Sequence, residues 1–152
     1  MKAGKCLNWI FKIKAVEKEY QVAVIARDVL GAEMKKRPAL LTKEGLQNLH
    51  FDDFSENLNS TYLVRMFTEF ESGLRDFWKI HLKKKSVAKA SVLIKSIGSH
   101  RKIYDQQIED VDKVREYRNT LIYDSDSGSE VVEIGAARRS LCIYFSRLPE
   151  DW

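Results

Sequence analysis

The chain has 152 residues, the usual size of one domain, and a net charge of +4. Its 44% hydrophobic and 32% charged residues fit an ordinary soluble globular protein with a hydrophobic core. No apolar run is long enough to span a membrane, and the first residues lack the apolar centre of a signal peptide. Cys6 and Cys142 are too few for a disulfide framework, so we expect a protein of the reducing cytoplasm without a membrane partner.

The first third of the chain indicates one long helix followed by mixed structure. Apolar residues recur near helical spacing over 16–36, and Pro38 ends that helix. Within 38–59, Thr42 can open a short helix, and 52–59 is predicted to form a loop. Only two prolines and seven glycines occur in the whole chain, which favours a helical fold.

The clearest helical pattern covers residues 60–82. Its broad apolar face consists of Leu63, Met66, Phe67, Phe70, Leu74, Phe77 and Trp78. We interpret the four aromatic residues of this face as core or dimer interface rather than as a platform for stacking nucleobases. On the exposed side, Arg65–Glu69 and Glu71–Arg75 have the spacing of ion pairs one turn apart.

The second half of the chain contains three shorter helical patterns. They cover residues 87–97, 106–122 and 133–148. Gly98 is predicted to end the first of these helices, and Asp105 to cap the second. The polar segment 124–130 is predicted to form turns, with pieces of strand possible only near Val131. The sequence therefore predicts a single all-α domain, residues 1–152, built as a bundle of five or six helices.

Arg118 interrupts the apolar stripe of its predicted helix. Four apolar residues lie within about 60° of it around the helix axis: Val111, Val114, Leu121 and Ile122. A guanidinium keeps its charge, so its burial is costly unless an acidic group pairs with it. Asn119 and Tyr123 lie one turn apart on an adjoining face. The pattern indicates either a site that combines a cation, an amide and a phenol, or a structural ion pair with Glu69 or Glu71.

Residues 83–102 carry seven Lys or Arg and no Asp or Glu. Lys83, Lys84 and Lys85 open this run and are candidates for contacts with an RNA backbone, although on charge alone a solvated helix and loop face is the simpler interpretation. No His or Cys pair has metal-ligand spacing, and no phosphate-binding glycine loop occurs, so neither a metal nor a cofactor is expected. We interpret His50 as a loop residue and His81 as a helix-end residue. Cys142 reads as a buried thiol on the last helix.

The stretch around Arg118 resembles the signature of the HEPN superfamily of all-helical nucleotide- and RNA-acting domains. That signature is an Arg, then four to six residues of which the first is usually polar, such as Asn, and then a His. Here Arg118-Asn119 is followed by three residues and then position 123. The flanking stretches 63–78, 114–119 and 147–152 look like those of uncharacterised bacterial members, so the resemblance covers residues 60–152.

The resemblance implies a symmetric homodimer whose two copies place their site residues in one shared cleft. Ribonucleases of this family cut RNA without a metal, because the 2′-hydroxyl of the RNA attacks the adjacent phosphate. Carried over to this sequence, Arg118 binds and stabilises the phosphate, Asn119 orients it, and position 123 supplies the acid and base. Glu71 and Arg115 are further candidates for positioning the substrate.

Position 123 departs from the family pattern because it holds Tyr in place of His. A phenol has a pKa of about 10, so it is protonated at neutral pH and is a poor base, although it can donate a hydrogen bond. Two explanations are open: a naturally inactive copy, or a His that was replaced so that a toxic protein could be expressed. Some relatives also carry, two residues after the His, a tyrosine that a partner nucleotidyltransferase adenylylates. Ser125 holds that place here, so this regulation is not expected.

The resemblance thus predicts an endoribonuclease toxin of a toxin–antitoxin or anti-phage system with impaired catalysis, whose partners are RNA, a second copy and an antitoxin such as a nucleotidyltransferase. The alternative is a non-catalytic helical module that holds RNA, a nucleotide or a partner protein in the same cleft. A plain dimeric scaffold is the third possibility, but it leaves Arg118 unexplained.

Overall fold

The computed structural model describes residues 4–123 and 128–152, and all of its regular structure is helical. The helices are α1 (Lys5–Lys36), α2 (Asn48–Ile80), α3 (Ala90–His100), α4 (Asp105–Tyr123) and α5 (Ile134–Phe145), with a short 3-10 helix, η1 (Thr42–Glu44). The predicted all-α bundle is confirmed. Val131 lies in irregular chain, so the suggestion of strand near it was wrong. Part of the predicted turn segment 124–130, including Ser125, lies outside the described residues.

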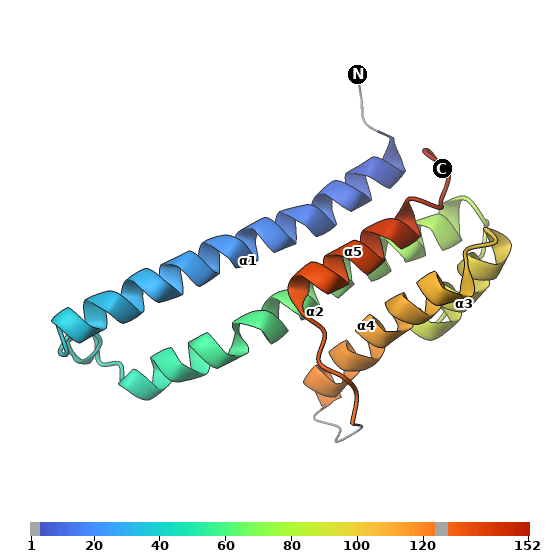
Figure 1. The fold of residues 1–152 in the computed structure, drawn as a ribbon. Coiled ribbons are helices and arrows are strands. Elements are labelled where there is room, and N and C mark those ends of the chain that lie inside the picture. Colours follow the sequence, from blue (N-terminus) through green and yellow to red (C-terminus); the bar gives the residue numbers. More distant parts are fainter. Residues whose placement is uncertain (1–3, 124–127) are drawn as a thin grey trace.

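α1 and α2 are the two longest helices and run antiparallel, and their far ends extend beyond the other helices as a hairpin (Figure 1). α1 begins at Lys5, well before the predicted start at 16. Its first turns bury Cys6, Ile10 and Ile13, whereas exposed Leu7 and Phe11 place apolar residues on a second face and hide the periodicity. No helix among the described residues is long and apolar enough to cross a membrane.

α2 begins at Asn48, so the predicted loop at 52–59 is helical. The start is fixed by a capping box, in which the backbone N–H of Gln47 donates to Nδ1 of His50 at 3.0 Å. His50 is therefore a capping residue of the first turn and not a loop residue. His81 lies at the C-terminal end of α2, as predicted. The sequence signal was missing because residues 48–57 are mostly exposed at the tip of the hairpin and carry no continuous apolar stripe.

Gly98 does not end α3, which continues to His100. The glycine is buried, and a Cβ at this position would come within 2.6 Å of Cδ1 of Ile108 on α4. Its role is therefore to let α3 and α4 approach closely.

The predicted exposed pair Arg65–Glu69 is also corrected: Arg65 instead bonds to Glu19 on α1, which joins the two long helices.

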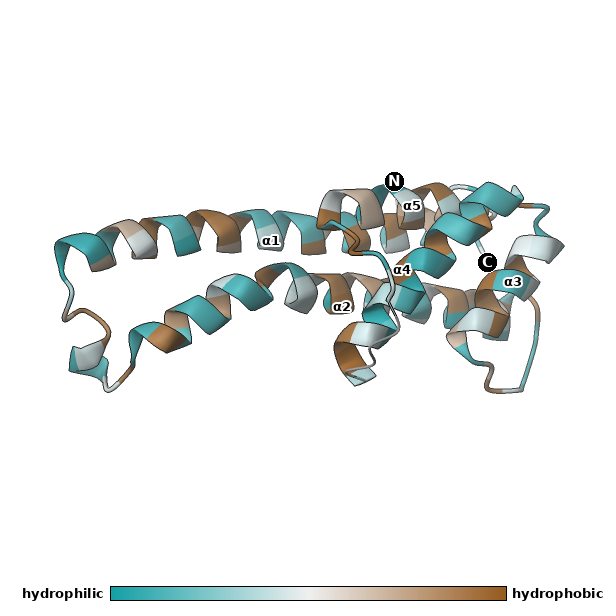
Figure 2. Cartoon of the chain, turned by 60° about the horizontal axis from the view of Figure 1, so that its bottom comes forward, coloured by the Kyte–Doolittle hydropathy of each residue, from teal (hydrophilic) through white to brown (hydrophobic). Residues whose placement is uncertain are grey.

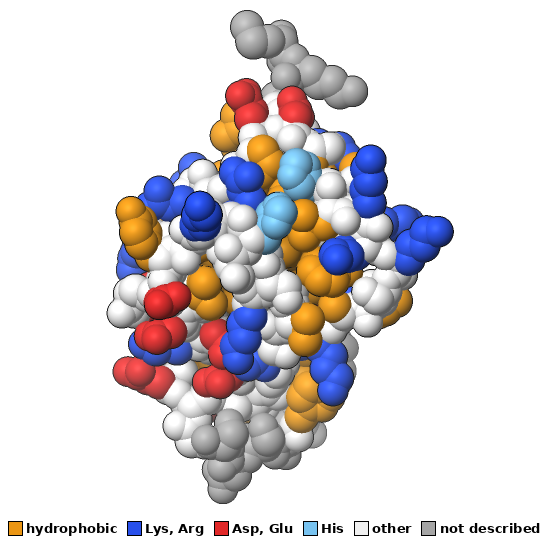
Figure 3. All heavy atoms as spheres, turned by 90° about the vertical axis from the view of Figure 1, so that its right-hand side faces the viewer, with side chains coloured by type: hydrophobic (Ala, Val, Ile, Leu, Met, Phe, Trp, Pro, Cys, Tyr) orange, Lys and Arg blue, Asp and Glu red, His pale blue; other side chains and the backbone are white. Residues whose placement is uncertain are grey.

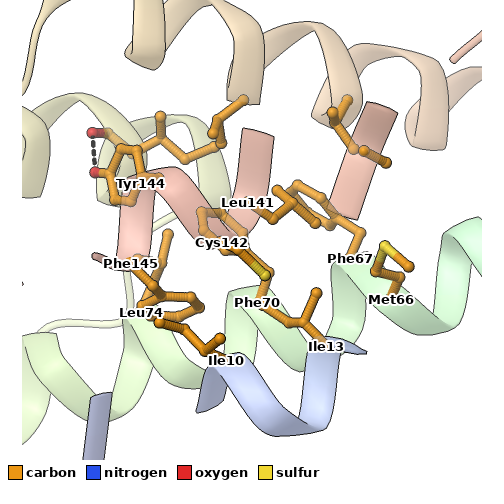
Figure 4. Close-up of a cluster of buried hydrophobic side chains, with 14 of the residues drawn as sticks. Ile10, Ile13, Met66, Phe67, Phe70, Leu74, Leu141, Cys142, Tyr144 and Phe145 are labelled. Atoms are coloured by element: carbon orange, nitrogen blue, oxygen red, sulfur yellow. Dashed lines mark hydrogen bonds between the residues drawn. The ribbon is translucent and has the colours of Figure 1, made fainter. Parts of the chain in front are cut away.

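The core lies where α1, α2 and α5 meet, with α3 and α4 closing one side (Figure 4). Phe67, Phe70 and Phe77 are fully buried, which confirms their interpretation as core residues. Phe70 makes edge-to-face contacts with Tyr144 and Phe145, at centroid distances of 5.5 and 5.0 Å. The Tyr144 hydroxyl donates to the Ile94 carbonyl at 2.6 Å, and Cys142 is buried on α5, as predicted.

The outer part of α1 exposes an apolar stripe at helical spacing (Figure 2). Val22, Ile25 and Val29 are 66%, 64% and 60% exposed, so the described residues of the chain leave this stripe largely uncovered. α1 packs against α2 and α5, while α4 packs against α2, α3 and α5. Among the described residues, α1 and α4 are thus not principal packing partners of each other.

Candidate functional site

Arg118 lies where α4 packs against α2, and its side chain is only 18% exposed. Nη2 donates to Oε2 of Glu71 at 3.2 Å, and Nη1 donates to Oδ1 of Asn119 at 2.9 Å. The guanidinium also lies 5.2 Å from the centroid of the Phe67 ring, a cation–π contact. Nε is buried and has no hydrogen-bond partner among the described residues. The cation is thus held on three sides by an anion, an amide and an aromatic ring.

Glu71 serves two arginines. Its Oε2 accepts from Arg118, while its Oε1 accepts from Arg75, one turn further along α2. The predicted pairing of Glu71 with Arg75 is therefore confirmed, but its predicted exposure is not, because the Glu71 side chain is only 17% exposed. A single carboxylate lies between two permanent cations. Arg75 also donates to the Ala88 carbonyl at 2.8 Å, which ties the chain before α3 to α2. The cluster keeps one excess positive charge, which favours an anionic ligand beside it.

Asn119 connects Arg118 to a surface pocket of about 550 Å³. Arg115 and Lys113 line the same pocket, together with residues 128–130 that follow α4. The Arg115 guanidinium bonds to Asp112 at 2.6 Å and lies 3.6 Å from Glu116. The hydrogen bond to Asp112 raises the pKa of Arg115, which therefore keeps its charge. Arg115 borders the site, but its charge is already matched by two carboxylates.

Tyr123 is the last residue of α4, and its side chain is 71% exposed. It makes no hydrogen bond to another described residue and does not line the pocket beside Asn119. One copy of the chain therefore brings together Arg118, Asn119 and Glu71, with Arg115 at the border, but leaves the phenol apart.

The predicted basic residues Lys83, Lys84 and Lys85 lie in the connection between α2 and α3. They line a second pocket of about 680 Å³ with Trp78 and Lys79 from the last turn of α2. Figure 3 shows this end of the bundle, where basic side chains spread across the face and most acidic ones gather at its lower left. Trp78 and Lys79 were not predicted to belong to this basic surface, because Trp78 was assigned to the core. The signal that points to them is their position just before the lysine run.

Two further observations bear on the site. The Arg118–Glu71 contact is expected both for a structural ion pair and for a phosphate-binding arginine held in position, so it does not decide between them. Of the two acidic residues considered, the structure pairs Arg118 with Glu71 and not with Glu69. Within residues 4–123 and 128–152, no group of three His, Cys, Asp or Glu side chains is placed to hold a metal ion.

In comparisons with known proteins, no family model, curated protein or solved structure matches the chain.

Proposed function

We propose that the protein is a HEPN-type, metal-independent endoribonuclease toxin of a toxin–antitoxin or anti-phage system, with catalysis impaired by Tyr123. The observation that carries the proposal is the Arg118 guanidinium, held by Glu71 and Asn119 next to a polar pocket. An antitoxin protein would restrain it in the cytoplasm. The residue pattern around Arg118 supports this class more than any other.

The proposed reaction forms a bond between the RNA 2′-oxygen and the adjacent phosphorus and breaks the bond from phosphorus to the 5′-oxygen. The products are a 2′,3′-cyclic phosphate and a 5′-hydroxyl. Charge grows on the phosphate oxygens as the new bond forms, and a preorganised arginine stabilises it. The 2′-hydroxyl must lose a proton to a base, and the leaving 5′-oxygen must gain one from an acid. The phenol of Tyr123 can donate a hydrogen bond, but a phenol is a poor base for the first proton transfer.

A second candidate function is a non-catalytic module that binds RNA, a nucleotide or a partner protein in the same cleft. The exposed position of Tyr123 favours it, because the phenol makes no contact with Arg118 within one copy of the chain. Binding requires only the cation and the amide, which are in place. This function and the ribonuclease function share the site but differ in the chemistry at position 123.

The ribonuclease function, and the binding function where its ligand is RNA, predict that Arg118 contributes to RNA binding. Arg118→Ala removes a charge-assisted contact, so we expect the affinity for single-stranded RNA to fall by about tenfold. Arg139→Ala on α5 is the matched control, since it removes the same charge from an exposed position, and it should change the affinity less than about twofold. Fluorescence anisotropy with a labelled oligonucleotide measures both. Equal losses in the two variants would contradict a specific role for Arg118.

The proposed cleft also predicts a two-fold homodimer with Arg118 and Tyr123 near its axis. Ile122, 45% exposed at the same helix end, then lies close to its own copy, so Ile122→Cys should form an intersubunit disulfide on oxidation. Cys6 and Cys142 are buried and should contribute little background. Ile25→Cys on the α1 stripe is the control. A monomer at tens of micromolar, or cross-linking through Ile25 but not Ile122, would be incompatible with the shared cleft.

A further inference from the structure

The pocket between the end of α2 and the connection to α3 has features that the catalytic proposal does not use. Its walls carry Arg75, Trp78, Lys79 and Lys83–Lys85, and no Asp or Glu lines it. No ion pair among residues 4–123 and 128–152 involves Lys79 or the three consecutive lysines. Four cations therefore share one concave surface without a protein counter-charge, which attracts an anion with several charges.

The pocket is built on a chain segment that is fixed to α2. The indole Nε1 of Trp78 donates to the Ser86 carbonyl at 3.1 Å, and Arg75 donates to the Ala88 carbonyl at 2.8 Å. Lys83 adopts φ of 52°, the left-handed conformation that turns the chain back toward the helix. Two side-chain anchors and a tight turn hold the lysines around the tryptophan, so little ordering is left for a ligand to impose.

Trp78 supplies an aromatic side chain that lines the same pocket as these charges. It is half-buried, packs against the core on one side and lines the pocket on the other. An indole stacks on the face of an unpaired base, whereas the faces of paired bases are covered by their neighbours in a duplex. Lysines that surround an aromatic ring are the combination that binds single-stranded nucleic acid, with phosphates on the cations and a base on the ring.

We propose that this pocket is a subsite for single-stranded RNA, in which Lys79 and Lys83–Lys85 hold backbone phosphates and Trp78 stacks on one unpaired base. The proposal rests on the proposed function, because the strand would continue along α2 to the Arg118 cleft. Arg75 marks the route: it lines the pocket and shares Glu71 with Arg118. Nothing in the pocket requires a 2′-hydroxyl, so single-stranded DNA should bind there equally well and remain uncut.

The lysines can be tested against a matched control at the other end of the molecule. K83E/K84E/K85E and K35E/K36E/R37E reverse the same number of charges, but the second triplet lies at the tip of the α1–α2 hairpin (Figure 1). We expect the first variant to weaken binding of an unstructured oligonucleotide more than about tenfold. The slope of log affinity against log salt concentration should also become shallower by about two, since each phosphate contact contributes about 0.7 to that slope. The second should change the affinity less than about threefold at 0.1 M salt. Equal losses in both variants would refute the site.

The tryptophan is tested with two substitutions. Trp78→Leu should lower the affinity for single strands by about five- to hundredfold, while Trp78→Phe keeps a ring and should retain most of the binding. Circular dichroism verifies folding, and Trp78→Phe also loses the bond to Ser86, so it separates stacking from loop anchoring. Unchanged single-strand binding by Trp78→Leu, equal affinity for a duplex, or Trp78-dependent binding of an acidic peptide in place of RNA would overturn the proposal.

The RNA-binding subsite and the ribonuclease function can be disproved independently of each other. The affinity measurements use 2′-deoxy oligonucleotides as well as RNA, so they need no catalysis. If these oligonucleotides bind through Trp78 but Tyr123→His cuts no RNA, the subsite stands and the ribonuclease proposal fails. If Tyr123→His cuts RNA and Trp78→Leu leaves the KM for that cleavage unchanged, the ribonuclease stands and the subsite fails.

Discussion

Tyr123→His is expected to raise RNA cleavage by about 10²–10⁴-fold over the parent protein, the usual contribution of general acid–base catalysis. The substitution supplies an imidazole, which serves as acid and base near neutral pH, where the parent has a phenol, which is a poor base. Position 123 is 71% exposed at the end of α4, so an imidazole fits there without repacking the core. Cleavage should be measured on a labelled RNA with the terminal groups of the products identified.

Three properties should accompany the gain of activity if the mechanism is the proposed one. Cleavage should persist in EDTA, leave a 2′,3′-cyclic phosphate, and disappear in the double variant Tyr123→His/Arg118→Ala. Expression of the single variant should arrest growth where the parent does not. A folded, dimeric Tyr123→His protein that cuts no RNA would favour the binding function, and cleavage that requires added metal would exclude the proposed mechanism.

The helices that carry a one-sided apolar stripe were predictable from the sequence. The C-terminal end of α2 and both ends of the helix that carries Arg118 were placed within two residues, because their apolar residues recur on one face and pack in one core. The start of α1 and the hairpin tip were not predictable in this way. There the helices are held by contacts that are distant in sequence or by a cap, such as Cys6 Sγ donating to the Phe145 carbonyl and the Gln47–His50 capping box.

The residues of the candidate site were predictable from the sequence, but their spatial arrangement was not. Arg118 stood out because a charge interrupts an apolar stripe, and Glu69 and Glu71 were the two candidate partners because both are acidic and lie at the edges of the facing helix; the structure selects Glu71. The Glu71–Arg75 pair also followed from its i,i+4 spacing, but that the same carboxylate serves Arg118, and that Arg75 reaches the basic pocket, depends on how α2 packs against α4 and the chain before α3. Periodicity specifies a residue's face, but not which oxygen of a shared carboxylate faces which cation.

The shared carboxylate makes the two ends of the Arg118–Glu71 pair unequal. When Arg118 is lost, Glu71 keeps its bond to Arg75, so no charge is left without a partner. When Glu71 loses its charge, Arg118 and Arg75 remain as neighbouring cations with no anion between them. Loss of one partner from a fully buried pair costs about 3–5 kcal/mol, and the 17% and 18% exposure of these side chains lowers that cost through solvent screening.

We therefore expect Glu71→Gln, which preserves the side-chain volume, to destabilise the fold by about 1–3 kcal/mol, and Arg118→Ala to cost about 1 kcal/mol or less. Because Arg118→Ala removes one of the two repelling cations, the double variant should cost less than the sum of the two single variants. Urea unfolding of the three variants and the parent gives these free energies. If Arg118→Ala instead costs several kcal/mol and destabilises the fold more than Glu71→Gln does, Arg118 is a structural ion-pair residue. Its contribution to RNA binding must then be measured with variants that keep the charge, such as Arg118→Lys.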